Sequence, residues 1–432
     1  MNSRAATPAD PPASLDWRSG WRYGLMGLPL AFVALPLYVL LPNFYARNFG
    51  VSLATLGAVL LGVRLFDTVI DPLLGRWVDR LHAHSSHRVL PWGAVTALLM
   101  CAGFALLFFP PLSLQGAPSA LLLWLGASLL LCTVAFSALS VLHQAWGARL
   151  GGEALYRSQV VAWREGLGLA GVIIASIAPA TLGIPATSAI LFIACVVGWL
   201  AWRKGPSAAA RTGVYTPDSP AQLWLPWRRP DFRRLMAVFL VNGIASAVPA
   251  TLMLFFVQDR LQAPASAEPL FLGSYFICAA LSIPLWLRLV PRLGLARTWG
   301  VGMALSIAVF MFASVLGTGD IAAFVVVCAL SGVALGTDLA LPAALLTGVI
   351  QANGDQQRLE GAYFGWWAFA AKLNLALAAG IALPVLGLLG YMPGSTDEGA
   401  LHTLTLAYCV LPCVLKAIAA TLLYFLILRK NP

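Results

Sequence analysis

Long apolar runs alternate with short polar connections along nearly the whole chain. An apolar run of about 20 residues can cross the hydrocarbon core of a bilayer as a helix. Inside lipid the backbone must satisfy its own hydrogen bonds, so these runs have to be helical. About twelve runs stand out, and we expect spanning helices at 22–46, 52–77, 89–110, 118–143, 158–181, 186–203, 234–257, 269–288, 298–316, 320–349, 362–390 and 402–428.

The composition agrees with this pattern. The chain has 432 residues, of which 60% are hydrophobic and 10% charged. Soluble globular domains carry roughly 25% charged residues, and a soluble fold of this size could not bury so much apolar surface. We therefore expect an integral membrane protein that has the lipid bilayer as its solvent.

The connections between the runs alternate in charge. One set is basic and contains Arg18, Arg22, Arg80, Arg88, Arg149, Arg157, Arg203, Lys204, Arg211, Arg228, Arg229, Arg233, Arg234, Arg288, Arg292, Arg297, Arg358, Arg429 and Lys430. The other set contains Arg47, Asp259, Arg260, Glu268, Asp320, Asp397 and Glu398. The positive-inside rule places the basic set and both termini in the cytoplasm. The net charge of +10 then reflects orientation, so we expect no nucleic-acid partner.

The longest basic connection lies at mid-chain and is rich in proline. It separates six predicted helices from six, which is typical of a linker between two repeats. We predict an all-α membrane protein with a cytoplasmic tail at 1–21, an N-terminal six-helix half at 22–203, a cytoplasmic linker at 204–233, a C-terminal six-helix half at 234–428 and a second tail at 429–432. This arrangement resembles the major facilitator fold.

Other signals exclude several kinds of site. All seven cysteines fall inside apolar runs without the spacing of metal ligands, so we expect no disulfide and no metal site of cysteines. The polar stretch 1–20 lacks the apolar core of a signal peptide, so we expect the first helix to be retained. No phosphate-binding glycine loop or nucleophile elbow is present, and we expect neither an enzyme nor a cofactor.

Three charged residues lie deep in the second apolar run. Arg64, Asp67 and Asp71 are spaced i, i+3 and i+7, so they project from one helix face. A charge in hydrocarbon costs several kcal/mol, so this face must line a cavity or pair with another helix. Two carboxylates one turn apart repel each other, and a bound cation or protons would relieve the repulsion. The alternative is a static bridge in which Arg64 and a second cation neutralise both acids.

The same segment carries a family signature. Residues 64–80 read Arg-x-x-Asp-x-x-x-Asp-Pro-x-x-Gly followed by Asp-Arg, which resembles helix two of the glycoside–pentoside–hexuronide:cation symporters. Residues 361–372, which end in Lys372, resemble helix eleven of that family. Residues 145–150, followed by Arg157 and Arg164, resemble its end of helix four and start of helix five.

The resemblance implies roles for individual residues. It implies that Asp67 and Asp71 bind the coupling cation, H⁺ or Na⁺, with Lys372 beside them. It implies that Arg164 contacts the solute. Read from the sequence alone, Lys372 in an apolar run also needs a carboxylate partner, and Asp67 or Asp71 is the evident candidate.

The sequence also departs from the family pattern. The sugar-transporting members carry acids on helices one and four, whereas 23–38 and 132–144 contain none here. Sugar recognition needs several convergent hydrogen-bond acceptors, so their loss weakens the sugar prediction. The loss also removes a family cation ligand and favours H⁺ slightly over Na⁺. An amphipathic or lipid-like solute therefore stays an alternative.

Several further residues are candidates. We expect Trp163, His143, Gln144, Asn242, Asp338 and Trp367 to contact solute with Arg164, although a buried His is more often a packing group and Trp residues are as often interface anchors. Asp79 and Arg80 resemble the superfamily's loop motif after helix two. We expect them, with Arg64, to act as structural or gating charges that stabilise one access state.

These observations predict a secondary transporter. We expect cation-coupled symport of a small organic solute, such as a sugar or glycoside, by alternating access. The resemblance places it in a bacterial inner membrane, and we expect a monomer. Alternatives from the same sequence are a carrier of an amphipathic, lysolipid-type solute and a membrane scaffold or enzyme without flux.

Overall fold

The computed structural model describes residues 14–51, 53–84, 89–114, 117–207, 220–391 and 394–430. The predicted tail positions 1–13, linker positions 208–219 and the last two residues lie outside them. All regular structure in the described residues is helical. The chain is therefore an all-helical membrane protein, as the hydrophobic pattern predicts.

The N-terminal part is built from long helices. Its elements are α1 (Trp17–Gly24), α2 (Gly27–Leu35), the π-turn η1 (Pro36–Leu40), α3 (Leu41–Phe49), α4 (Leu53–His84), α5 (Val89–Phe108), the 3₁₀ turn η3 (Leu112–Leu114), α6 (Pro118–Arg149) and α7 (Ala154–Arg203). α7 contains a kink at Gly183, whose φ of 80° suits glycine. The kink falls between the predicted helices 158–181 and 186–203.

The C-terminal part follows the linker. Its elements are η4 (Pro220–Trp224), α8 (Leu225–Arg228), α9 (Pro230–Phe255), η5 (Phe256–Arg260), η6 (Ala265–Ala267), α10 (Glu268–Leu293), α11 (Leu295–Ala313), α12 (Ile321–Ala352), α13 (Glu360–Leu388), α14 (Glu398–Thr405), η7 (Leu406–Val410), α15 (Leu411–Leu426) and η8 (Leu428–Lys430). In the described part of the chain, nine helical segments are long and apolar enough to cross a membrane. The predicted spans 22–46, 52–77 and 362–390 are not among them. The second of these is α4, which carries the charges that make it a candidate site.

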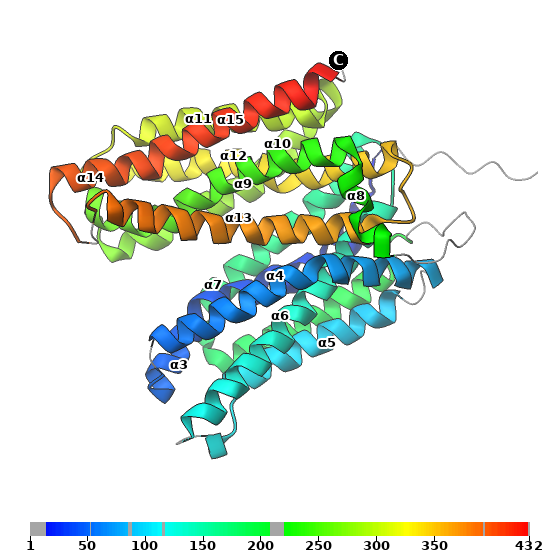
Figure 1. Ribbon diagram of the computed structural model, residues 1–432, viewed down its shortest axis with the longest axis horizontal. Helices are drawn as coiled ribbons and strands as arrows, with labels where there is room; N and C mark the ends of the chain where they lie inside the picture. The colour runs from blue at the N-terminus through cyan, green and yellow to red at the C-terminus, as the bar shows by residue number, and fades with distance from the viewer. Residues whose placement is uncertain are drawn as a thin grey trace, which may run out of the picture.

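The helices form two groups that meet at one end (Figure 1). In the view, α3–α7 lie below and α9–α15 lie above, and the groups separate towards α3 and α14. We call that end the open end, and the end near α8 the closed end. Between the groups, α13 packs on α4 and α6, while α7 packs on α10 and α12. One hydrophobic core runs through both groups, and a second lies within the C-terminal group.

Glycines let α4 and α13 approach closely. A Cβ atom on Gly75 would collide with the backbone oxygen of Gly361, and one on Gly365 would lie 2.6 Å from the backbone oxygen of Asp71. Small residues at such crossings allow helix backbones to touch in a membrane. This contact brings the charged face of α4 against α13.

Candidate functional site

A lysine from one group of helices lies between two carboxylates of the other. Lys372 Nζ on α13 is 2.7 Å from Asp67 Oδ2 and 2.8 Å from Asp71 Oδ2, both on α4. Both aspartates are buried, whereas 15% of the Lys372 side chain is exposed. The structure thus brings together the three residues that the sequence analysis assigned to the coupling cation.

Ser137 on α6 completes this central cluster. Its hydroxyl donates to Asp67 Oδ1 at 2.8 Å and accepts from Lys372 Nζ at 2.8 Å. Ser137 is not among the predicted site residues, because a serine in an apolar helix carries no charge that requires a partner. The cluster therefore draws on three helices, with both groups represented.

In the central cluster two carboxylates face a single ammonium. Arg64 lies one helical turn from Asp67 towards the open end, so the two acids and two bases of this region balance in charge. The Lys372 ammonium lies between the two carboxylates and neutralises them. Without it, a proton or a metal cation would have to do so. The arrangement can therefore exchange one cation for another, provided that the lysine withdraws.

A cavity of about 280 Å³ adjoins the cluster. It is lined by Leu37, Leu60, Leu61, Val63, Arg64, Asp67, Leu129 and Thr133. Aliphatic side chains make up most of this lining, and the polar groups come mainly from α4. The cavity offers a large apolar surface with a charged edge.

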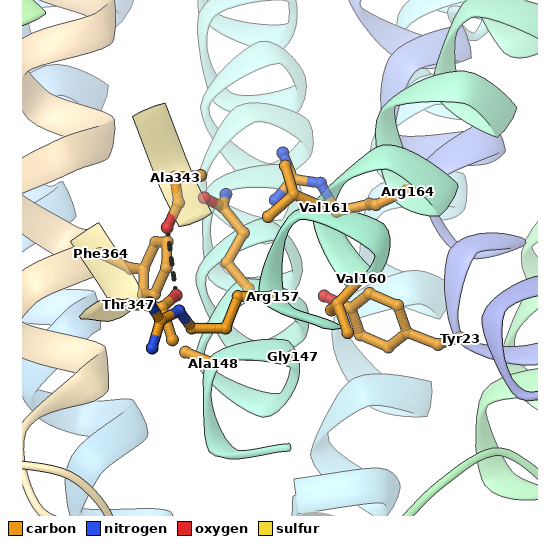
Figure 2. A pocket seen from close by; sticks show the side chains of 11 residues that line it. Tyr23, Gly147, Ala148, Arg157, Val160, Val161, Arg164, Ala343, Thr347 and Phe364 are labelled. Atoms are coloured by element: carbon orange, nitrogen blue, oxygen red, sulfur yellow. Dashed lines mark hydrogen bonds between the residues drawn. The ribbon is translucent and has the colours of Figure 1, made fainter. Parts of the chain in front are cut away.

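A second, smaller pocket contains both predicted arginines of α7. Its volume is about 20 Å³, close to the space that one water molecule needs. It is lined by Tyr23, Gln144, Gly147, Ala148, Arg157, Val160, Val161, Arg164, Ala343, Thr347 and Phe364. Figure 2 shows Arg157 extending from α7 towards Thr347 and Phe364, which belong to the other group of helices.

The two arginines have different partners. Arg164 Nη2 is 2.5 Å from Glu165 Oε1, its neighbour in sequence. Arg157 donates to the side-chain oxygen of Gln351 on α12 and, at 3.3 Å, to the carbonyl oxygen of Gly152. The contact between Arg157 and Gln351 therefore connects the two groups.

Of four other candidates, three lie in packed surroundings and the fourth, Gln144, lines the smaller pocket. His143 is buried, with Nε2 2.9 Å from the Tyr23 carbonyl oxygen and its ring stacked on the Tyr23 ring at 4.3 Å. Trp367 stacks on Phe239 at 3.6 Å, and the Trp163 indole covers the position where Gly20 would carry a Cβ atom. Gln144 donates to Ser140 and lines the smaller pocket.

The remaining two candidates belong to another lysine cluster. Lys416 Nζ on α15 is 2.8 Å from Asp338 Oδ2, 2.9 Å from Asn242 Oδ1 and 3.0 Å from Ser246 Oγ. Asp338 also accepts from Asn242 Nδ2 at 3.0 Å and from Trp299 Nε1 at 2.7 Å. Lys416 is not among the predicted site residues, although it lies in an apolar run as Lys372 does and needs a carboxylate partner for the same reason.

Charged side chains connect the two groups of helices at the closed end. Asp79 at the end of α4 accepts hydrogen bonds from the backbone N–H groups of Gly361 and Ala362, both at 2.7 Å. These N–H groups lie in the first turn of α13, where free donors and the helix dipole favour a negative charge. Arg149 and Glu360, both fully buried, form an ion pair at 2.9 Å nearby. Arg80 is exposed.

The linker is attached at the same end. Arg229 binds Asp355 through two hydrogen bonds of 2.9 and 2.8 Å, which favour the charged guanidinium and raise the pKa of Arg229 above its ordinary value. Trp366 on α13 donates to the carbonyl oxygen of Leu223 at 2.8 Å. The described part of the linker therefore packs against α13.

Comparison with known proteins gives one family and several distant relatives. The model of the family described as MFS/sugar transport protein matches residues 22–430. The putative glycoside/cation symporter YagG of Escherichia coli K12 is 25% identical and covers 91% of this chain and 88% of its own. The glucuronide carrier protein homolog of the same organism is 23% identical, covering 95% and 92%. The mouse sphingosine-1-phosphate transporter MFSD2B is 22% identical, covering 89% and 83%.

Solved structures share the fold. A bacterial homologue of the iron transporter ferroportin in an outward-facing state has a TM-score of 0.68 and 18% identity, covering 94% of this chain and all of its own. The E. coli fucose:proton symporter FucP has a TM-score of 0.63 and 13% identity, covering 93% and 97%. At these identities the likeness shows a major facilitator fold and nothing of the solute.

Proposed function

The chain belongs to the MFS/sugar transport protein family, and on that premise we propose that it is a cation-coupled symporter of a small organic solute. Membership confirms the resemblance to the glycoside–pentoside–hexuronide:cation symporters. It is a family of membrane transporters and not of enzymes. Coupling to a cation is supported by the central cluster, in which Lys372 lies between Asp67 and Asp71.

We propose twelve spanning helices in two halves, 22–203 and 234–428, joined by a linker at 204–233, in a bacterial inner membrane. The closed end carries the basic linker, Arg149 and Arg157, so the positive-inside rule assigns it to the cytoplasm together with the tails 1–21 and 429–432. The open end then faces outward. We propose that the protein works as a monomer, since each chain has both halves.

The proposed coupling step starts at Lys372. A proton or Na⁺ that neutralises Asp67 or Asp71 weakens the hold on the ammonium, and the bond between α4 and α13 loosens. Because these helices belong to different halves, ion binding changes the balance between outward-facing and inward-facing states. The absence of the family's helix-four acid slightly favours H⁺ as the coupling ion, with Na⁺ as the alternative.

The other candidate residues take supporting roles in this proposal. Asp79 stabilises the closed cytoplasmic end through the first turn of α13, with Arg80 and Arg64 as accessory charges. Gln144 and Arg164 contact the solute from the smaller pocket. His143, Trp163 and Trp367 support the surrounding walls, while Asn242 and Asp338 hold Lys416.

The solute has two candidate classes. YagG is named a glycoside/cation symporter and MFSD2B a sphingosine-1-phosphate transporter. The aliphatic lining of the 280 Å³ cavity favours an amphipathic solute over a bare sugar, because apolar walls leave hydroxyl groups without partners. Binding of such a solute without gradient-sensitive flux would instead indicate a scaffold.

Asp71→Asn tests the coupling proposal. The amide keeps the shape of the carboxyl group but cannot be neutralised by a cation, so gradient-driven uptake is expected to disappear while folding is kept. Thermal unfolding of the purified protein in Na⁺ or choline, across a range of pH, is expected to lose its ion dependence. Asp231→Asn, an exposed site, is the matched control. Undiminished gradient-driven uptake by Asp71→Asn would falsify the proposal.

A further inference from the structure

We infer that the protein binds an anionic phospholipid at an exposed basic surface where α1 meets the end of α7. Trp146, one turn before Arg149 on α6, donates to the carbonyl oxygen of Pro206 at 3.1 Å, which places the end of α7 at the closed end. The site is independent of the proposed transport function. Its exposed residues, which we call the α1–α7 surface, are Trp17, Arg18, Trp21, Arg22 and Lys204.

α1 packs along the last turns of α7. Arg22 Nη1 donates to the carbonyl oxygen of Lys204 at 3.2 Å. A Cβ atom on Gly205 would lie 3.5 Å from Arg22 Cβ, and one on Gly198 would lie 3.4 Å from the carbonyl oxygen of Leu25. The contact between the helices therefore extends over about two turns of α7. Two basic residues from segments far apart in the sequence lie next to each other at its polar end.

The positive charge of this surface is not cancelled within the described residues. The Arg18 guanidinium lies 5.4 Å from the centre of the Trp17 ring, and Arg22 donates to a carbonyl oxygen. Neither arginine forms an ion pair in the described part of the chain. The nearby acid, Asp16, accepts hydrogen bonds from two backbone N–H groups as the N-cap of α1. An external anion is therefore needed to neutralise the arginines.

An apolar stripe of α7 leads to the same surface. Ile193, Val197 and Leu200 are 59%, 46% and 39% exposed. They are spaced at i, i+4 and i+7, and Lys204 follows at i+11, so all four share one helix face. Among the candidate spans in the described residues, Thr181–Arg203 has the smallest buried share, 22%. This face therefore contacts acyl chains, and the basic residues lie where the apolar stripe ends.

The tryptophans of α1 indicate the depth of the headgroups. Trp17 and Trp21 are 63% and 44% exposed and lie one helical turn apart. An indole has an apolar body and a polar N–H group, which is typical of the membrane–water interface. Guanidinium groups bind phosphate oxygens through parallel hydrogen bonds, and basic clusters beside a membrane helix attract anionic headgroups. A phospholipid uses both the cations and the apolar stripe, whereas a soluble phosphate uses only the cations.

Binding of matched lipids tests the inference. Palmitoyl-oleoyl phosphatidylglycerol and palmitoyl-oleoyl phosphatidylcholine have the same acyl chains and differ in net charge, and glycerophosphoglycerol has the anionic headgroup without acyl chains. Native mass spectrometry of the full-length protein in detergent is expected to show that phosphatidylglycerol binds tighter than either by about tenfold or more. Equal affinity for the two lipids, or for the lipid and the free headgroup, overturns the inference.

A double variant assigns the preference to the α1–α7 surface. Arg18→Gln with Arg22→Gln removes two positive charges, and the affinity for phosphatidylglycerol is expected to fall about fivefold for each. Arg288→Gln with Arg292→Gln is the matched control, since these arginines are also exposed and four residues apart but lie on α10. The control is expected to keep the affinity of the unmodified protein. An equal loss in both double variants, or no loss in either, overturns the inference.

Asp16→Asn tests the same surface by an expected gain. Asparagine caps a helix about as well as aspartate, so α1 is kept while the acid beside Arg18 is removed. The affinity for phosphatidylglycerol is expected to rise about two- to fivefold. A gain of this kind cannot result from loss of folding. Unchanged or weaker binding in this variant contradicts the inference.

Discussion

Two lysine–carboxylate clusters lie inside this protein, and they differ in what they connect. The central cluster joins Lys372 on α13 to Asp67 and Asp71 on α4, across the two groups of helices. The second cluster joins Lys416 on α15 to Asp338 on α12, within the C-terminal group. Both keep charge in a membrane interior by pairing it.

The balance of partners also differs. Lys416 has three oxygen partners, and Asp338 accepts from Asn242, Ser246 and Trp299 besides the lysine. The charges of Lys416 and Asp338 cancel, and both side chains are well hydrogen-bonded. Because both residues belong to the C-terminal group, a rigid movement of that group would leave their contacts unchanged. In the central cluster one lysine is shared between two carboxylates, and its side chain is more exposed than that of Lys416, 15% against 7%. The comparison suggests that an ion pair is exchangeable where it crosses a moving boundary, and fixed where it does not.

The largest effect is expected at the central cluster. Lys372→Ala leaves two buried carboxylates without their ammonium, which should destabilise the outward-facing state by roughly 3–5 kcal/mol and abolish gradient-driven uptake. Uptake into proteoliposomes, normalised to folded protein from size-exclusion chromatography, measures it. Lys372→Arg keeps the charge and is expected to retain part of the stability. Full gradient-driven uptake by Lys372→Ala would show that the central cluster, like the second cluster, is structural and takes no part in coupling.

The second cluster should affect stability and leave coupling unchanged. Lys416→Met is expected to lower the free energy of unfolding by roughly 3–5 kcal/mol, and adding Asp338→Asn should recover much of it because no buried charge is left unpaired. Thermal unfolding of the purified variants measures the effect. The double variant is expected to keep the ion dependence of uptake. If that dependence disappears, the second cluster takes part in coupling and the contrast fails.

The smallest effect is expected at the closed end. Asp79→Asn keeps the shape of the cap but removes the charge that the α13 N-terminus favours, and its amide NH₂ cannot accept the second backbone hydrogen bond, a loss of about 1–2 kcal/mol. The balance should move roughly five- to thirtyfold towards the inward-facing state. Labelling of a cysteine introduced at Thr347 measures the opening of the smaller pocket to the cytoplasm. Unchanged labelling would show that Arg149 and Glu360 keep this end closed without Asp79.

The surroundings of several predicted solute-contact residues could not be predicted from the sequence. Trp163, Trp367 and His143 are neutral or weakly polar, and each lies in packed surroundings. Burying a neutral side chain costs far less free energy than burying a charged one. Its position in an apolar run therefore does not predict which residues it contacts. Ser137 was missed for the same reason.

The sequence by itself determined the helices, their apolar character and the pairing of Lys372 with the aspartates of α4. Hydrocarbon imposes these features residue by residue, because a backbone polar group or charge inside lipid must find a partner. Tertiary structure alone decided which helices became neighbours: that Ser137 reaches Asp67, that Lys416 meets Asp338, and that Asp79 caps α13. Those contacts depend on how side chains and glycines of helices far apart in the sequence pack together. The periodicity of a single apolar run does not predict that packing.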